Sequence, residues 1–187
     1  RSFLYKFVIN NRAANYKRKH ITNLLNQLTT NSDKIYNNKI ICNGSKFVKS
    51  QLPKNYIYFH IKKDIVDKLS WDIAKLKMLF NELLKHYDNV IFTKDIEKTE
   101  NSNFINNEFN FIDFKNKKII IKSTNPKITL FDNIEGEDLY YTIKNSSKIL
   151  AFHGMMTNLG SIELKKVLDL WYCDIKCLND YKNYRNA

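Results

Sequence analysis

The 187-residue sequence has no long apolar run, only four glycines and only three cysteines. No apolar segment approaches the roughly 18 residues of a membrane-spanning helix, and the opening RSFLYKFVIN lacks the layout of a secretory signal peptide. The glycines form no G-x-G-x-x-G motif, so the usual dinucleotide-binding fingerprint is missing. These absences exclude a membrane-spanning helix in this sequence and favour a cytoplasmic location.

The three cysteines, Cys42, Cys173 and Cys177, are odd in number, so they cannot all form disulfide bonds within the chain. Free thiols are typical of a reducing compartment. No cysteine has enough Cys or His neighbours at ligand spacing to bind zinc, and we expect no metal site.

Positive charge is what the sequence has in excess. Its 31 Lys and Arg residues outnumber 19 Asp and Glu residues, which gives a formal net charge of +12. Such a surface favours anionic partners: nucleic acid, phosphorylated small molecules or the anionic face of a membrane. Part of the excess accompanies the general abundance of Lys, Asn and Ile, so charge alone does not select the partner.

Short apolar runs alternate with segments of helical period from residue 53 onward. The predicted strands are 56–61, 90–93, 118–122, 149–152 and 167–171, and the predicted helices are 70–87, 137–145 and 157–164. Ser70 is the expected N-cap of the first of these helices, and 97–117 has no clear period. The alternation predicts an α/β fold: a Rossmann-like, doubly wound parallel sheet with helices on both faces.

The domain organisation follows the change in composition near residue 50. Residues 1–50 are predicted to form a basic helical segment with an Asn-rich connector, serving as a linker or the remnant of an N-terminal lobe. Residues 51–175 form the Rossmann-like domain, and 176–187 a C-terminal helix. The sequence begins with Arg1 rather than Met, so we expect it to be a segment of a longer protein.

Two histidines follow predicted strands at the same edge of the sheet. His60 lies at the end of the first strand and His153 just past the fourth, and ligands of open α/β sheets bind beyond the carboxyl ends of the strands. Either histidine alone is better explained as a hydrogen-bonded core residue, and it is their shared position at this edge that favours a ligand site. Lys94, at the end of the second strand, is a weaker candidate because a single lysine in a basic protein is usually solvated.

Gly154 follows the fourth strand and precedes a predicted helix. A residue without Cβ lets the backbone turn sharply and lets a ligand approach closely. Thr157 and Asn158 then open the helix, whose unpaired amides and positive dipole end suit a phosphate. An ordinary strand-to-helix turn remains the alternative.

The stretch HGMMTNLGSIELKKVLDLW, residues 153–171, resembles the donor-site segment of bacterial GT-B fold glycosyltransferases. The resemblance is to the heptosyltransferase-like group and to its capsule and lipopolysaccharide relatives. The matching positions are His153, Gly154, Met156, Thr157, Leu159, Ser161, Lys165 and the strand 167–171. The sequence departs from the pattern at three positions: Met155 replaces a Gly, Asn158 a His and Gly160 an Ala.

A second stretch, residues 60–97, resembles the opening of the same family's C-terminal lobe, where a strand is followed by a Lys, a Trp, an amphipathic helix and a second strand. Lys68 and Trp71 fall at the Lys and Trp of that pattern, and in the family the Lys reaches the nucleotide phosphates. The similarity covers about residues 53–173.

The resemblance implies the donor-binding part of a glycosyltransferase in polysaccharide biosynthesis, which transfers a sugar from a nucleotide sugar to a glycan or lipid-linked acceptor. No cofactor is implied, since the nucleotide sugar is the substrate, and the acceptor-activating base comes from the other lobe. Stabilising the departing phosphate is then the main task. The expected donor-binding and phosphate-binding residues are His60, Lys62, Lys68, Trp71, Lys94, His153, Gly154, Met155, Met156, Thr157, Asn158 and Ser161.

Two other functions remain open. A nucleic-acid-binding module would use the positive charge and the eleven Tyr and twelve Phe residues for stacking, but the aromatic residues lie in apolar runs and the basic residues are scattered. A noncatalytic α/β interaction domain would explain the departures at Met155 and Asn158.

Overall fold

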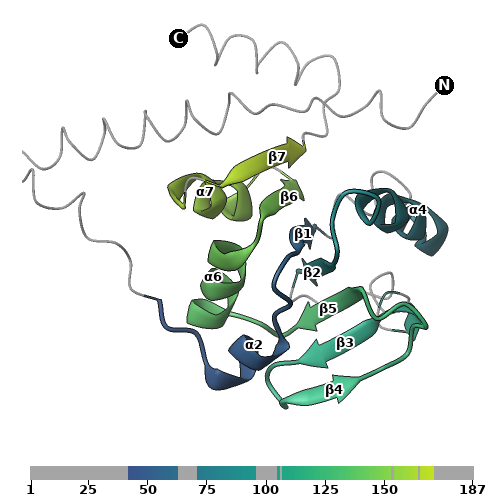
Figure 1. Ribbon diagram of the computed structural model, residues 1–187, viewed down its shortest axis with the longest axis horizontal. Helices are drawn as coiled ribbons and strands as arrows, with labels where there is room; N and C mark the ends of the chain where they lie inside the picture. Colours follow the sequence, from purple (N-terminus) through teal and green to yellow (C-terminus); the bar gives the residue numbers. More distant parts are fainter. Residues whose placement is uncertain are drawn as a thin grey trace, which may run out of the picture.

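A computed structural model describes residues 42–62, 71–95, 105, 107–152, 154–163 and 165–170 (Figure 1). The predicted helices in 1–30 and 176–187 lie outside these residues, as do Lys68, Ser70, His153, Cys173 and Cys177. The described elements are α2 (Lys46–Gln51), β1 (Ile57–Ile61), α4 (Ile73–Leu83), β2 (Val90–Lys94), β3 (Asn110–Asp113), β4 (Lys118–Ile120), β5 (Ile128–Asp132), α6 (Gly136–Asn145), β6 (Lys148–Phe152), α7 (Met155–Ile162) and β7 (Lys166–Leu170).

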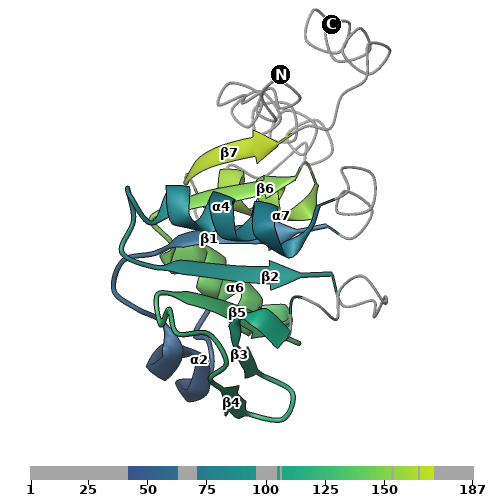
Figure 2. The same ribbon diagram turned by 90° about the vertical axis from the view of Figure 1, so that its right-hand side faces the viewer.

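The strands form one seven-stranded sheet in the order β4-β3-β5-β2-β1-β6-β7. Every neighbouring pair is parallel except β3 and β4, which are antiparallel. Figure 2 shows β6, β1, β2 and β5 running side by side in one direction. The predicted α/β class is therefore confirmed, with a mostly parallel rather than fully parallel sheet.

The helices cover both faces of the sheet. Figure 1 shows α4 on one face and α2, α6 and α7 on the other. From β1 the chain moves to β2 on one side, and it later returns to β6 and β7 on the other side. The winding direction reverses between β1 and β6, which is the point where doubly wound sheets bind ligands.

Two apolar cores follow from the alternation of side chains along the central strand. Ile57, Phe59 and Ile61 of β1 pack on the α4 side, whereas Tyr58 packs on the side of α2, α6 and α7. All five residues of β1 are buried, as is typical of a parallel strand covered on both faces. No helix in the ranges that the structure describes has both the length and the hydropathy to cross a membrane.

Three elements differ from the expectations drawn from composition. The segment expected to be an aperiodic insertion contains β3, and β5 was not predicted at all. The strand β3 (NFID) has only two apolar residues, and Thr129 interrupts the apolar run of β5 (ITLFD), so neither forms a continuous apolar run. The expected connector contains α2, whose N-cap Ser45 donates its hydroxyl to Asp138 Oδ2 at 2.8 Å.

Two helix starts are also corrected. The α4 helix begins at Ile73, and its N-cap is Asp72 rather than Ser70; the Asp72 carboxylate accepts from the Lys75 amide at 2.8 Å. The α7 helix begins at Met155, two residues earlier than predicted.

The carboxylate of Asp113 fixes the turn between β3 and β4. It accepts hydrogen bonds from the backbone amides of Lys115 and Asn116 and from the side-chain amides of Asn116 and Asn133. Partial burial acts to raise the pKa of Asp113, but these hydrogen bonds together lower it below its ordinary value.

Truncating the aromatic core under α4 should be costly. Phe80 is fully buried against Phe59, Phe92 and Phe109, with ring centroids 5.9, 4.8 and 5.3 Å away. We expect Phe80→Ala to lower the free energy of unfolding by about 3–5 kcal/mol in urea titrations. Met78→Ala, at a position 71% exposed in the same helix, should change it by less than about 0.5 kcal/mol. Similar losses in both variants would contradict this packing.

Acid should weaken the β3–β4 turn. Because the pKa of Asp113 is lower in the folded than in the unfolded state, its stabilisation is present above about pH 4 and is lost as pH falls through the folded-state pKa. The difference in unfolding free energy between the wild type and Asp113→Asn should therefore shrink below about pH 4. Urea titrations in a pH series measure it, and a difference that stays constant into strong acid would contradict the expectation.

Candidate functional site

The carboxyl ends of β1 and β6 lie side by side at the reversal of the sheet. The two strands pair in parallel with His60 opposite Ala151, so the residues that follow them, Lys62 and Gly154, come together. A Cβ atom at position 154 would lie 2.8 Å from Lys62 Nζ and 3.2 Å from Lys62 Cε. The ammonium group thus occupies the space that a side chain at 154 would need, and Gly154 itself is only partly buried.

The turn from β6 into α7 is held by Thr157. Its hydroxyl donates to the Gly154 carbonyl at 2.8 Å and accepts from the Gly154 amide at 3.2 Å. The Asn158 amide donates to the same carbonyl at 3.2 Å and begins the helical ladder. The amides of Met155, Met156 and Thr157 therefore precede the ladder, where a helix presents its positive dipole end.

A chain of hydrogen bonds lies beside this turn on the same face of the sheet. Tyr58 Oη lies 2.6 Å from Thr93 Oγ1, and Thr93 Oγ1 lies 2.8 Å from His60 Nδ1. His60 Nε2 lies 3.2 Å from Asp95 Oδ1. The side chains of Tyr58, Thr93 and His60 are all buried, and that of Asp95 is about one-third exposed at 36%.

The partners assign the protons in this chain. An ionised carboxylate only accepts, so Nε2 of His60 donates to Asp95 Oδ1, and the Thr93 hydroxyl bridges His60 Nδ1 and Tyr58 Oη. Burial raises the pKa of Tyr58 above its usual range. Its hydroxyl therefore stays protonated, and its proton is available to Thr93 Oγ1.

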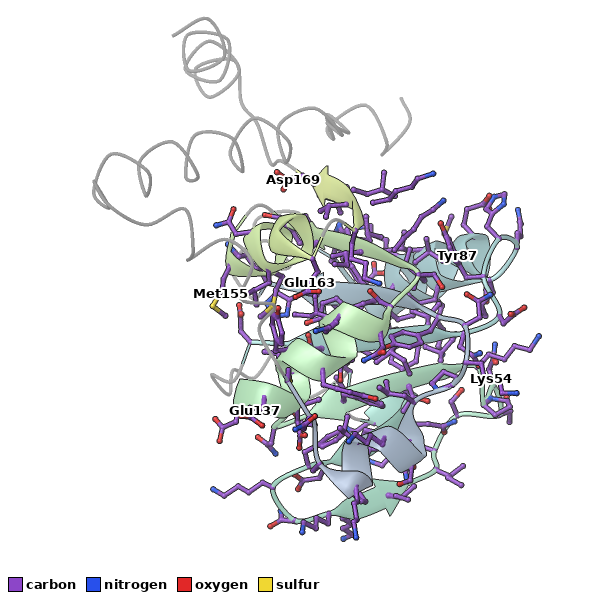
Figure 3. The ribbon with its side chains drawn as sticks, turned by 60° about the vertical axis from the view of Figure 1, so that its left-hand side comes forward. Lys54, Tyr87, Glu137, Met155, Glu163 and Asp169 are labelled. Atoms are coloured by element: carbon purple, nitrogen blue, oxygen red, sulfur yellow. The ribbon has the colours of Figure 1, made fainter. Side chains whose placement is uncertain are left out.

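Met155 and Met156 face opposite environments at the start of α7. Met156 is buried, and its Sδ lies 3.6 Å from Tyr58 Oη, which links the hydrogen-bonded chain to the first turn of α7. Met155 is 62% exposed. Figure 3 shows it at the end of the molecule opposite Lys54 and Tyr87.

Two other predicted donor-binding residues lie apart from this turn. Trp71 is buried on the α4 face, with its ring centroid 6.4 Å from that of Phe59 and 5.6 Å from that of Phe152. Lys94 Nζ lies 3.7 Å from Asp132 Oδ1 at the ends of β2 and β5, and both side chains are largely buried. Core packing accounts for the position of Trp71, and the ion pair with Asp132 accounts for that of Lys94. Ligand binding by either residue stays a prediction.

Some of the other predicted site residues lie among the described residues and some do not. It brings together Lys62, Gly154, Thr157, Asn158 and both methionines, with His60 on the neighbouring strand. Lys68, His153 and the side chain of Ser161 lie outside the described residues.

Gly160 has a packing role in α7. A Cβ atom there would lie 2.5 Å from Ile149 Cδ1 and 2.8 Å from Val167 Cγ2. The glycine therefore lets α7 pack closely on β6 and β7.

Sequence reasoning missed Tyr58, Thr93 and Asp95. Thr93 and Asp95 could have been found from their positions at the end of the predicted second strand, which lies at the same edge of the sheet as His60. Without the register that pairs His60 with Thr93, nothing connected these residues to the histidine.

Comparisons with known proteins found no matching family model, curated protein or solved structure. Among the residues that the structure describes, no group of three or more His, Cys, Asp or Glu side chains could hold a metal ion.

Breaking the buried chain should show coupling between its members. Thr93→Val should lower the free energy of unfolding by about 1–3 kcal/mol, because it leaves His60 Nδ1 and Tyr58 Oη with one partner fewer. In urea titrations, Thr93→Val combined with Tyr58→Phe should cost less than the sum of the single changes, by roughly 0.5–3 kcal/mol.

The matched control is Tyr56→Phe. Tyr56 is equally buried, but its hydroxyl donates to the Thr142 carbonyl at 2.6 Å and shares no partner with Thr93. Its effect should add to that of Thr93→Val within about 0.5 kcal/mol. Equal additivity for both tyrosines would rule out the chain.

Proposed function

We propose that the chain binds the phosphate groups of a nucleotide sugar at the carboxyl ends of β1 and β6, as the donor-binding part of a GT-B fold glycosyltransferase. The observation that carries the proposal is the Lys62 ammonium group lying against Gly154 at the start of α7. A lysine, a residue without Cβ and a helix N-terminus converge there at the reversal of a doubly wound sheet.

Each of these features favours a phosphate over an uncharged ligand. The first amides of α7 donate hydrogen bonds along a dipole whose positive end lies at Gly154. Lys62 adds a full positive charge on a flexible stem that can turn toward a phosphate oxygen. The exposed side chain of Met155 offers an apolar surface at the same turn for an uncharged part of the ligand.

Sugar transfer is the reaction that fits such a site. Transfer from a nucleotide sugar releases a phosphate or diphosphate, and positive groups already in place stabilise the charge that develops on it. The resemblance of residues 153–171 to glycosyltransferase donor sites supports the same reaction, and in that family the acceptor-activating base comes from the other lobe. We accordingly expect this chain to bind the donor without turning it over.

The described aromatic residues do not favour the nucleic-acid alternative. Stacking on bases requires exposed rings, whereas eight of the largest fully buried side chains are aromatic: Tyr56, Tyr58, Phe59, Phe80, Phe92, Phe109, Phe131 and Phe152. These rings form the two cores on either side of the sheet.

Thermal unfolding of the full chain with UDP, GDP, ADP, CMP and their sugar derivatives tests the proposal. A ligand at 100 times its Kd stabilises the folded state by about 2.7 kcal/mol. For a chain of this size, that corresponds to a rise in Tm of about 5–10 °C. We expect at least one nucleotide to produce it, and a panel without any shift would overturn the proposal.

Two variants locate the binding. Lys62→Ala should weaken the binding of that nucleotide by roughly 10- to 100-fold, the effect of losing a charged hydrogen bond. Gly154→Ala should act in the same direction with little change in the Tm of the free protein, because the new methyl group displaces only the flexible end of Lys62.

The matched control is Lys127→Ala, which removes the same charge from an exposed position. Lys127 lies at the amino end of β5, whereas the candidate site lies at the carboxyl ends of the strands. This variant should leave nucleotide affinity unchanged. Equal weakening by Lys62→Ala and Lys127→Ala would indicate general charge attraction. A steeply salt-dependent affinity for a generic oligonucleotide, without a nucleotide response, would favour the nucleic-acid function.

A further inference from the structure

The outer edge of β4 has no partner strand among the described residues. The β4 strand ends the sheet and pairs only with β3, with Ile119 opposite Ile112 and Lys118 opposite Asp113. Figure 1 shows it as the last strand beside β3. Such an edge presents a row of backbone N–H and C=O groups to any extended chain that aligns with it.

Two exposed isoleucines mark this edge. Ile119 and Ile121 are 53% and 79% exposed, among the few large apolar side chains that the described residues leave in solvent. Ile119 pairs with the buried Ile112, so it lies on the face of the sheet whose core includes Ile112. Ile121 follows the end of β4 by one residue. Apolar surface therefore extends from the core to the last strand and the residue after it.

The charge around the edge has one sign. Between Asp113 and Asp132 the sequence contains no acidic residue and five lysines: Lys115, Lys117, Lys118, Lys122 and Lys127. The carboxylate of Asp113 is already engaged by the turn amides. Lysines and a short edge strand also protect a sheet from aggregation, so the two exposed isoleucines are the feature of this edge that points to a partner.

A second copy of the chain is a poor occupant of this edge. Antiparallel pairing of residues 118–122 of two copies, which are β4 and the two residues after it, would place Lys118 of each copy opposite Lys122 of the other. Like charges directly opposite destabilise a ladder. The net charge of +12 adds long-range repulsion. A strand with carboxylates at these two positions would have favourable pairs instead.

We propose that β4 binds an extended acidic segment of a partner protein, which adds to the sheet as a further strand. Apolar residues of that segment cover Ile119 and Ile121, and flanking Asp or Glu side chains pair with Lys118 and Lys122. Backbone hydrogen bonds supply affinity, while the isoleucines and lysines supply selectivity. This surface is separate from the strand ends of β1 and β6, so it does not depend on the proposed nucleotide site.

Fluorescence anisotropy of labelled peptides with the full chain tests the proposal. The probe is an acetylated peptide with the core Glu-Ile-Val-Ile-Glu, and its control has the core Lys-Ile-Val-Ile-Lys. We expect the acidic peptide to bind at least roughly tenfold more tightly, with an affinity that falls as salt is added. Binding that cannot be detected, or equal binding of both peptides, would overturn the proposal.

Variants of the chain separate strand addition at β4 from other binding. Ile121→Thr and Lys118→Glu should each weaken the acidic peptide by roughly tenfold. Met78→Gln, which removes an equally exposed apolar side chain from α4, should leave it unchanged. A peptide N-methylated at alternate backbone positions should not bind if it pairs as a strand.

Two outcomes would replace the proposed occupant. Concentration-dependent dimers in sedimentation that disappear with Ile121→Thr would identify a second copy as the partner. Full binding of the N-methylated peptide would show attraction without strand pairing. Either result overturns the proposal, and neither bears on nucleotide binding at Lys62.

Discussion

Parallel pairing of β1 with both β2 and β6 is the constraint on which the molecule depends. Parallel neighbours cannot be joined by a tight hairpin, so each needs a crossover, and crossovers in two directions place helices on both faces. The chain uses α4 toward β2 and returns through α6 to β6. The reversal that results leaves the carboxyl ends of β1 and β6 without a crossover between them. The candidate site lies there because of the winding, before any side chain is considered.

Side chains of β1 alternate between the two faces of the sheet, so this strand contributes both to the core and to the candidate site. Odd-numbered residues of β1 pack on the α4 side, and the even-numbered Tyr58 and His60 lie on the side of α7. Burial of Phe59 therefore fixes the register that holds His60 beside Thr93 and brings Lys62 beside Gly154. A slip of one residue would exchange the two sets. The register of β1 that buries its apolar side chains is thus also the register that forms the site.

The sequence predicted β1, β2, β4, β6 and β7 from short segments rich in apolar residues. It missed β3, which has only two apolar residues, and it missed β5, in which Thr129 interrupts the apolar run. Within the site, Gly154 was predicted from its position after a strand, and Lys62 was among the phosphate-binding residues expected with the resemblance. The contact between Lys62 and Gly154 was not predicted, because it depends on the pairing of β1 with β6, about 90 residues apart in the chain. The partners of His60 were missed for the same reason.

The fit between Lys62 and Gly154 also restricts how this protein can vary over evolutionary time. Any side chain at 154 would need the room now taken by the end of the lysine. A substitution at either position therefore changes what the other will tolerate, and their effects should not be independent. Without the lysine the glycine would no longer be needed to leave room for it, whereas with the lysine present a side chain at 154 would move the ammonium group away from its place at the start of α7.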